Sequence, residues 1–588
     1  MRVTEQQTFG VLVNNLERSR ARSLELQQQV STGKKVRKPS DDPSAFNHIS
    51  LDKASVASIE QRLRNISFGR TRLDLSDKLL SSTTDTLSRV QELAVQFGSD
   101  TNGPAERVIG SREVRQLYSL VQQYANAELN GQPVFTGTST HGRTTGLAIT
   151  TPVTLTNGTN DLLVVSVDGV TSGTIDLTSA TGSLTGAQLA ARVQTQINAD
   201  AALTAAGKHV TVTFETDHLV IASDAHGSDS TVTVTGGTSR AALGLVGGSR
   251  TTGDKPFALT ATTSPGSTNT GGALVSQGSV VDDNLVTLDD YVIRFSSATQ
   301  YDVLDVTVPV NVTKSSANTG GAFASDAGII GPANLTLNSY SIQFTSSTQY
   351  NIVNTTTSAT VSSGNTYVSG NAIEFDGLRV VLSNSDRGGP QNGDAYAVSL
   401  TPRTVLANQT YSTGSDISFD GLRLQLSTGS GAPATGDRFA VVTGLQYQGD
   451  AGVHQVEVGN NQVVPTNVSG DRVFSGPNID LFDSIKTLVT SLRTNYRGGI
   501  RDTIGDVGTG LSQAGAVLGE VGALSNRLTG SAGRLDEFKS FFTQTLSETE
   551  DVDLAKAISD LTLQQYAIEA ASRTLNQLFG NSLLKYLQ

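Results

Sequence analysis

The chain has 588 residues, a net charge of −12, no cysteine, no tryptophan and one methionine. Disulfides, thiol catalysis and cysteine-based metal sites are therefore excluded, and the negative charge argues against nucleic-acid binding as a main activity. No apolar run is long enough to cross a bilayer, so we expect no membrane insertion. At this length the chain has room for several domains.

A heptad pattern begins near the N-terminus. From residue 9 onward, apolar or small residues are spaced alternately three and four apart, which is typical of a helix packed lengthwise against another helix. An isolated amphipathic helix of this length is marginal in water, so this seam needs a partner. The N-terminal seam comprises Phe9, Leu12, Leu16, Ser19, Ser23, Leu26 and Val30.

A helix–break–helix joint follows this seam. Gly33 stands just past the last seam residue, where a left-handed C-cap is favoured. Ser40, Asp41 or Asp42 can cap the next helix, with Pro43 in its first turn. The joint motif comprises Gly33, Pro39, Ser40, Asp41, Asp42 and Pro43.

The joint carries a family resemblance. The run Ser31-Thr32-Gly33-Lys34, followed by Pro39-Ser40-Asp41-Asp42-Pro43, resembles the N-terminal signature of bacterial flagellins and the related hook–filament junction proteins. A second element, Asn130-Gly131 followed by Phe135-x-Gly137, is more characteristic of the junction proteins than of filament flagellins. The resemblance covers roughly residues 1–137 and 473–588.

Long helices are predicted on both flanks of the chain. Between residues 45 and 97 apolar residues recur every seven positions, and helical spacing continues from 108 to about 129, which favours an antiparallel return onto the first helix. Helical spacing resumes after residue 473. The first heptad row comprises Ile59, Ile66, Leu73, Leu80, Leu87 and Ala94.

The middle of the chain, residues 138–472, has a different composition. Threonine, serine, glycine and valine dominate, and alternating runs indicate half-buried strands. The exception is residues 185–203, where Leu189, Val193 and Ile197 keep helical spacing. Strands on both sides of this helix indicate a small α+β module, which resembles the insertion modules of flagellins and filament-cap proteins.

Internal repeats follow this module. The pattern of residues 287–301 returns at 336–350, and the pattern of 373–379 returns at 417–423. Gly393-Asp394 likewise returns as Gly436-Asp437. Each repeat is a strand–turn–strand unit, and two clear copies favour a pair of β-sandwiches over a long solenoid. Residues 138–472, called the insert below, are bounded by breaks in composition. We therefore expect the insert to be dispensable for the rod formed by the long helices on both flanks.

A second seam lies at the C-terminus. It comprises Leu554, Ile558, Leu561, Gln565, Ile568, Ser572, Leu575 and Phe579. Residues 1–38 carry a net charge of +5 and residues 546–588 a net charge of −3, and opposite signs favour association of the two ends. We therefore predict that the two seams pair and form an assembly interface.

The predicted fold is α+β and multidomain, with a split, coiled-coil-like helical rod and a large β-rich insertion. Residues 1–38 with 546–588 are expected to form a terminal helix pair, and 39–137 with 473–545 the rod. Residues 138–250 form the α+β module and 251–472 the β-rich repeats.

No motif of an active site is present. The sequence lacks a phosphate-binding loop, a Gly-x-Ser-x-Gly elbow and a His-Glu-x-x-His helix, so we predict neither an enzyme nor a cofactor. His209, His218 and His226 lie near three aspartates, but their loose spacing favours polar residues at strand edges over a metal site. The turns Asp376-Gly377 and Asp420-Gly421 are explained by turn chemistry rather than by cation binding.

The resemblance implies a structural subunit of the bacterial flagellum, most like the junction proteins between hook and filament. Its expected partners are copies of itself, the neighbouring hook-associated protein, flagellin and an export chaperone. It would lie outside the cell in the flagellum, exported without a cleaved signal peptide. The alternatives are a filament flagellin and a secreted β-rich adhesin.

Overall fold

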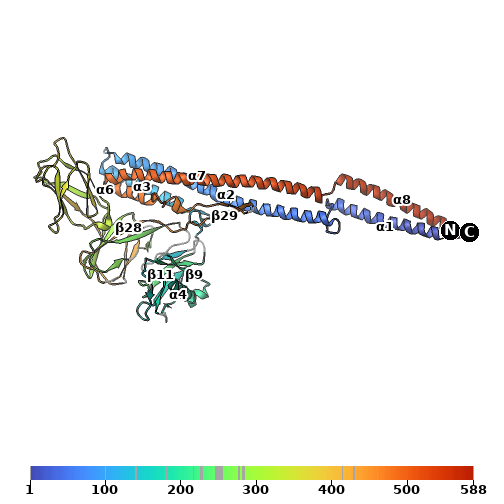
Figure 1. The fold of residues 1–588 in the computed structure, drawn as a ribbon, viewed down its shortest axis with the longest axis horizontal. Coiled ribbons are helices and arrows are strands. Elements are labelled where there is room, and N and C mark those ends of the chain that lie inside the picture. Colours follow the sequence, from blue (N-terminus) through green and yellow to red (C-terminus); the bar gives the residue numbers. More distant parts are fainter. Residues whose placement is uncertain are drawn as a thin grey trace. The chain divides into compact units, whose positions relative to one another are not determined.

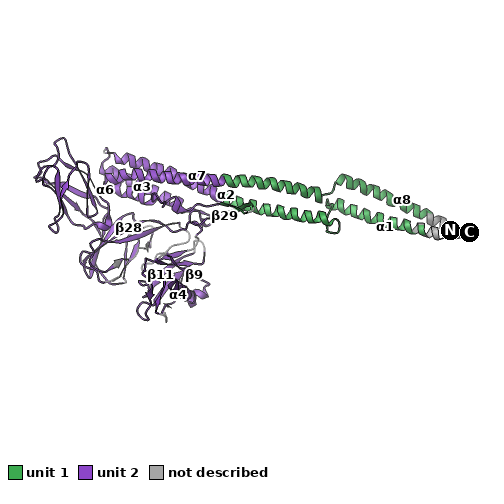
Figure 2. Ribbon diagram, in the orientation of Figure 1, with its two compact units in different colours: residues 1–70, 456–464, 526–588 green, residues 71–455, 465–525 purple. Residues whose placement is uncertain are grey.

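The structure is a computed structural model that describes residues 2–586, except 100, 139–141, 179–181, 216, 226–229, 246–255, 276–278, 281, 283–284, 414, 428–430 and 460. The side chains of residues 2–6, 8, 9, 274, 279, 425, 427 and 578–586 also lie outside the description. The chain divides into two units (Figure 2). Unit 1 comprises residues 1–70, 456–464 and 526–588, and unit 2 comprises residues 71–455 and 465–525.

Unit 1 consists of helices and one hairpin. It holds α1 (Arg2–Thr32), the first part of α2 (Pro43–Gly98), the last part of α7 (Arg497–Glu550), α8 (Leu554–Tyr586) and most of the hairpin of β29 (Gln455–Gly459) and β30 (Gln462–Pro465). Within this unit α2 and α7 run antiparallel: Glu60 pairs with Lys539 at 2.9 Å, and Lys53 pairs with Glu550 at 2.7 Å.

Unit 2 contains a bundle of four helical segments. These are the rest of α2, α3 (Pro104–Ala125), α6 (Leu481–Thr494) and the rest of α7. The predicted antiparallel return of α3 onto α2 is confirmed, since Arg89 pairs with Glu113 at 2.8 Å and Arg107 donates to the Phe97 carbonyl at 3.0 Å. The predicted heptad row along α2 is also confirmed, because all six of its members are buried.

A tight turn leads from α3 into the insert. Asn130 and Gly131 have φ angles of 54° and 75°, and they connect β1 (Glu128–Leu129) to β2 (Gln132–Pro133). A two-residue hairpin with a type I′ turn requires positive φ at both central residues, and asparagine followed by glycine adopts it at low cost.

The α+β module has its own buried core. Its predicted helix is present as two helices, α4 and α5, because Asp200 ends the first and caps the second by accepting from the backbone N–H groups of Ala202 and Leu203. The elements are β3 (Arg143–Thr145), β4 (Val153–Thr154), β5 (Leu162–Val167), β6 (Val170–Thr171), β7 (Ile175–Asp176), β8 (Ser183–Leu184), α4 (Gly186–Asn198), α5 (Ala201–Ala205), β9 (Val210–Glu215), β10 (His218–Ser223) and β11 (Val232–Gly236).

Two β-sandwiches follow, and one is nested inside the other. Sandwich A consists of β12 (Phe257–Pro265), β13 (Leu274–Val275), β14 (Ser279–Val280), β15 (Asp290–Ser297), β16 (Gln300–Asp305), β25 (Arg403–Thr410), β26 (Asp416–Phe419), β27 (Leu422–Ser427) and β28 (Arg438–Tyr447). Sandwich B consists of β17 (Val310–Lys314), β18 (Phe323–Ile329), β19 (Tyr340–Phe344), β20 (Gln349–Asn354), β21 (Ala359–Thr366), β22 (Ala372–Phe375), β23 (Leu378–Ser383) and β24 (Ala395–Leu400). Sandwich B occupies the connection between β16 and β25.

The two sandwiches have the same topology. Their five-stranded sheets have the orders β12-β28-β15-β16-β25 and β17-β24-β19-β20-β21, and each sandwich encloses its own core. The repeated patterns in the sequence therefore correspond to equivalent strands, such as β15 and β19. The nesting was not predicted, because a repeat read along the chain does not reveal which strands become neighbours.

The repeated Asp-Gly pairs are hairpin turns, as predicted. Asp376 and Gly377 have φ angles of 44° and 77°, and Asp420 and Gly421 have nearly the same values, 42° and 76°. Each carboxylate also accepts a hydrogen bond from a buried tyrosine hydroxyl. Each Asp-Gly pair therefore forms a turn, and its aspartate also binds a tyrosine of the same sandwich.

The insert shares a core with the helices, contrary to our expectation that it is dispensable. The ring of Phe257, on β12, is fully buried. Its centroid lies 5.1 Å from that of Phe482 on α6, 5.2 Å from that of Phe474 and 5.2 Å from that of Tyr447 on β28. Removing the insert would therefore open the helical core, and the composition breaks that suggested independence do not mark a packing boundary.

Candidate assembly interface

The two terminal helices, α1 and α8, pack against each other in unit 1 (Figure 1). The side-chain amide of Gln564 donates to the carbonyl of Ser19 at 3.2 Å. Close to the joint, the backbone N–H of Val552 donates to the carbonyl of Gly33 at 2.9 Å. The partner number falls as the α1 number rises, so the helices are antiparallel, and Leu16 lies at about the level of Ile568.

Small and branched side chains line this contact. On α1, Ser23 and Leu26 are buried, and on α8 Ala557 and Leu575 are buried. The half-buried members of the predicted seams are Leu12, Leu16, Ser19, Val30, Leu561, Ile568 and Ser572. The side chains of Phe9 and Phe579 lie outside the described residues.

The seam of α8 differs from the predicted one in its first turns. Leu554 and Ile558 are 47% and 51% exposed, and the buried residue is Ala557. Gln564 rather than Gln565 reaches α1. Both registers have steps of three and four, so spacing alone does not separate them. The small side chain of Ala557 lets the two backbones approach where the neighbouring Ile558 would hold them apart.

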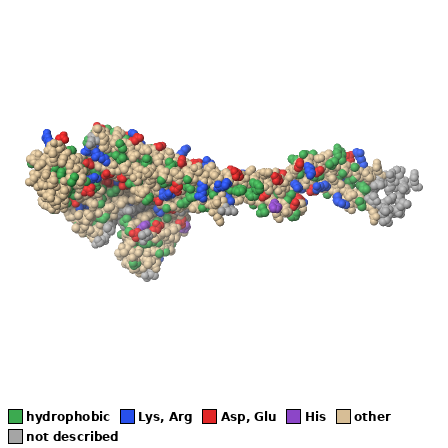
Figure 3. Space-filling view, turned by 45° about the horizontal axis from the view of Figure 1, so that its top comes forward, with side chains coloured by type: hydrophobic (Ala, Val, Ile, Leu, Met, Phe, Trp, Pro, Cys, Tyr) green, Lys and Arg blue, Asp and Glu red, His purple; other side chains and the backbone are tan. Residues whose placement is uncertain are grey.

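Large apolar side chains project away from this contact on both helices. Val11 and Leu24 on α1, and Leu563 and Tyr566 on α8, are between 59% and 66% exposed. At 100° per residue each points roughly 100° or more away from the seam of its own helix. Figure 3 shows hydrophobic side chains at the molecular surface, among basic and acidic ones. Packing of α1 on α8 therefore leaves apolar surface uncovered on both helices.

The joint motif has the capping that its sequence predicts. Gly33 follows α1 with a φ of +71° and donates to the Gln29 carbonyl at 2.8 Å, which is a left-handed C-cap. Asp42 caps α2 by accepting from the backbone N–H groups of Ser44 and Ala45 at 3.0 and 2.9 Å. Pro43 is the first residue of α2.

The remaining joint residues stabilise the turn between the two helices. Asp41 folds back and accepts from the backbone N–H groups of Arg37 and Lys38 at 3.1 and 3.2 Å. Pro39 and Ser40 lie in the exposed turn, next to the backbone that Asp41 holds. Of the three residues that could cap α2, the structure therefore selects Asp42 and gives Asp41 a different partner.

A buried carboxylate in this joint was missed by the sequence reading. Glu550, the last residue of α7, is 6% exposed, and its Oε1 accepts from the Nζ of Lys34 at 2.5 Å and from the Nζ of Lys53 at 2.7 Å. Burial acts to raise the pKa of Glu550, but the hydrogen bonds from the two lysines outweigh it, so the pKa lies below its ordinary value of 4.5. The bond to Glu550 also raises the pKa of Lys34.

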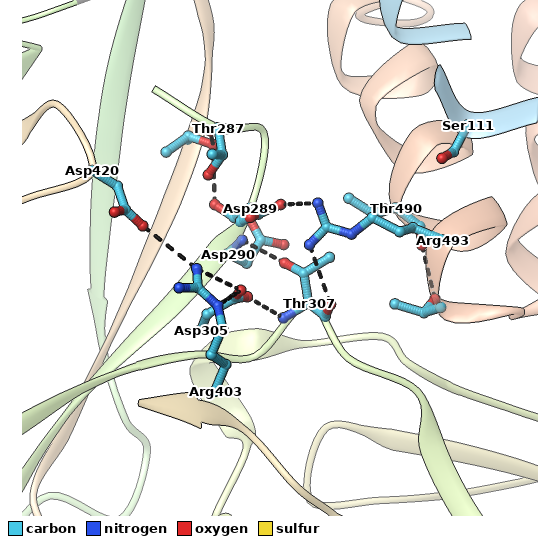
Figure 4. Close-up of polar contacts among 12 residues, drawn as sticks. Ser111, Thr287, Asp289, Asp290, Asp305, Thr307, Arg403, Asp420, Thr490 and Arg493 are labelled. Carbon is cyan, nitrogen blue, oxygen red and sulfur yellow. Dashed lines mark hydrogen bonds and ion pairs between the residues drawn. The ribbon is translucent and has the colours of Figure 1, made fainter. Parts of the chain in front are cut away.

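A second polar cluster ties sandwich A to α6 in unit 2 (Figure 4). Asp289, just before β15, pairs with Arg493 of α6, and Arg493 also donates to the Thr307 carbonyl at 3.3 Å. Asp290 pairs with the buried Lys486 of α6 at 2.6 Å. Burial raises the pKa of Asp290, although the lysine opposes the shift. These pairs reinforce the shared aromatic core.

Sandwich B supplies a cap for a helix of the bundle. Asp326, on β18, accepts from the backbone N–H groups of Arg497 and Gly498 at 2.9 and 2.7 Å. These are the first two residues of α7, whose N–H groups have no partner within the helix. The carboxylate also carries the charge favoured at a helix N-terminus.

The described residues contain no cluster of three or more histidine, cysteine or acidic side chains placed to hold a metal ion. His226 and one of the three aspartates near it, Asp229, lie outside the description. Among the described helices, none combines the length and apolar character that a membrane crossing needs.

Comparison with known proteins agrees with this geometry. Residues 6–140 match the family described as the bacterial flagellin N-terminal helical region, and residues 502–587 match the bacterial flagellin C-terminal helical region. Both ends of the chain are flagellin-like. The matched regions include α1 and α7 except their first residues, together with the joint, α2, α3 and α8. Residues 141–501 lie outside both matches.

Curated relatives match over part of their length. Flagellar hook-associated protein 3 of Salmonella typhimurium is 27% identical over 141 residues, which cover 24% of this chain and 44% of that protein. The flagellar filament 31.3 kDa core protein of Treponema maltophilum is 30% identical over 111 residues, which cover 19% of this chain and 39% of that protein. The chain thus spans less than half the length of these relatives.

A solved structure matches over most of both chains. The crystal structure of FlgL from Xanthomonas campestris covers 84% of this chain and 99% of that chain, at 14% identity and a TM-score of 0.29.

Proposed function

We propose that this chain is a structural subunit of the bacterial flagellum that polymerises at the junction of hook and filament through its paired terminal helices. The observation that carries the proposal is the apolar surface left uncovered on α1 and α8, within regions that match flagellin. Fully covering a leucine or valine side chain contributes about 1.5–3 kcal/mol, so several such side chains favour association strongly.

The occupants of this surface are copies of the same chain and the neighbouring axial proteins of the flagellum. A helix pair with apolar side chains pointing in several directions is suited to contact neighbours on more than one side. We propose that residues 1–38 and 546–588 form the inner layer of the assembly, that 39–137 and 473–545 form a surrounding layer, and that the insert faces outward. The assembly interface then comprises the seam residues together with the exposed residues beside them.

The junction is favoured over the filament by two observations. The first is the match to hook-associated protein 3 named above, and the second is the Asn-Gly turn leading to Phe135 and Gly137. The match to a filament core protein keeps filament flagellin as the second candidate. In either case we propose a structural rather than a catalytic role, with export to the flagellum assisted by a chaperone.

Immunogold labelling of intact flagella tests this proposal. An antibody against the insert should label a single short band at the hook end of each flagellum. Labelling along the whole filament would contradict a role at the junction and would support the alternative that the protein is a filament flagellin. Absence of the protein from purified flagella would contradict any axial role and would favour the adhesin, which should then be found on the cell surface or in the medium.

A further inference from the structure

At the joint of unit 1 the helices of two antiparallel chain segments are interrupted at the same level. α1 ends beside Gly33, and α7 ends at Glu550, with three residues between Glu550 and the first residue of α8. The segments are stitched together by two backbone hydrogen bonds, from Lys35 N–H to the Glu550 carbonyl at 2.7 Å and from Val552 N–H to the Gly33 carbonyl at 2.9 Å. Lys34 and Asp551 form the antiparallel bridge between them.

The carboxylate of Glu550 forms ion pairs with two lysines at this joint. It holds Lys34, which follows α1, and Lys53, which belongs to α2. Since both ammonium groups contact one oxygen, they are at most about 5 Å apart, and without an anion between them they would repel. The other facing charge is Asp551, which receives a hydrogen bond from Ser547 at 2.6 Å and lies close to Lys34.

We propose that Glu550 is a clasp that fixes the direction in which α1 and α8 leave the adjoining stretches of α2 and α7. Gly33 and the three residues after Glu550 leave the backbone free to bend, so two backbone hydrogen bonds alone do not hold one angle. The carboxylate links the segment after α1, the helix α2 and the end of α7 at a single point. Glu550 is thus a positioning residue for assembly; this role rests on the proposed function, whereas the clasp is a property of the single chain.

The clasp should open in acid. Because the pKa of Glu550 is held below its ordinary value, the ionised form stabilises the joint above pH 4.5, and this contribution is lost as the pH falls below 4.5 through the lowered pKa. Acid also protonates other carboxylates of the chain, so a variant without the Glu550 charge is needed to assign the effect.

Distance measurements between two spin labels test the clasp in the isolated full-length chain. The chain has no cysteine, so Ser31→Cys near the end of α1 and Ser58→Cys on α2 give two unique, exposed labelling sites. Pulsed electron paramagnetic resonance then yields the distribution of distances between the two labels. The variants are Glu550→Gln, Lys34→Gln with Lys53→Gln, and the matched control Glu548→Gln, an exposed residue of the same helix.

The parent should give one narrow distribution at pH 7. At pH 7 the width of the distance distribution should at least double in Glu550→Gln and in the double lysine variant, and it should stay unchanged in Glu548→Gln. Below pH 4.5 the width should increase in the parent but not in Glu550→Gln. The clasp would be refuted if Glu550→Gln gave the same width as the parent, or if the parent distribution at pH 7 were already as broad as the one expected for Glu550→Gln. Since no flagellum is involved, either result is independent of the localisation experiment.

Discussion

Truncating Phe257 to alanine should uncouple the insert from the helical bundle. The ring is fully buried and lies within 5.2 Å of three other aromatic rings, which come from β28, from the segment before α6 and from α6 itself. Truncation of a buried phenylalanine costs about 3–5 kcal/mol, from lost transfer energy and the cavity left behind. Because the cavity is bordered by both parts, both should be destabilised.

Hydrogen exchange followed by mass spectrometry measures this effect locally. Amides of α6 and of β28 that exchange by opening of the shared core should exchange about 100-fold faster or more, since 1.4 kcal/mol corresponds to a factor of ten. Phe323→Ala is the matched control: this phenylalanine of sandwich B is 46% exposed, and its truncation should change stability by about 0.5 kcal/mol or less. Faster exchange confined to β28, with α6 unchanged, would refute a common core.

Three further predictions concern the helices. Ile568→Asp puts a charge into the α1–α8 contact, so it should abolish assembly while the melting temperature of unit 2 stays the same. The exposed control Glu569→Lys should affect assembly far less. A lowered melting temperature with intact assembly would contradict the proposed interface. Asp326→Ala uncaps α7 and should lower the free energy of unfolding of unit 2 by about 1 kcal/mol in urea titrations, and no change would show that the cap is not needed. Brief proteolysis of the monomer should trim both ends and stop at the joint, whereas cleavage first within the joint would contradict its stitching.

Local rules account for much of what could be predicted from the sequence. The heptad row of α2 is buried as expected because the period of a helix is fixed by its backbone. Gly33, Asp42 and the Asp-Gly turns behave as expected because caps and turns depend on residues within a few positions of one another. The flagellin-like ends were recognised for the same reason, since their motifs are short and continuous.

The tertiary structure decided what depends on residues far apart in the chain. Glu550 looks like any other acidic residue of a helix end until Lys34, 516 positions away, is brought to it. The nesting of sandwich B and the contact of Phe257 with α6 likewise follow from which surfaces meet. The register of α8, in which Ala557 rather than Ile558 is buried, is likewise seen only in the folded chain. A sequence specifies periods and caps locally, but burial and ion pairing are properties of neighbours in space, and these exist only once the chain has folded.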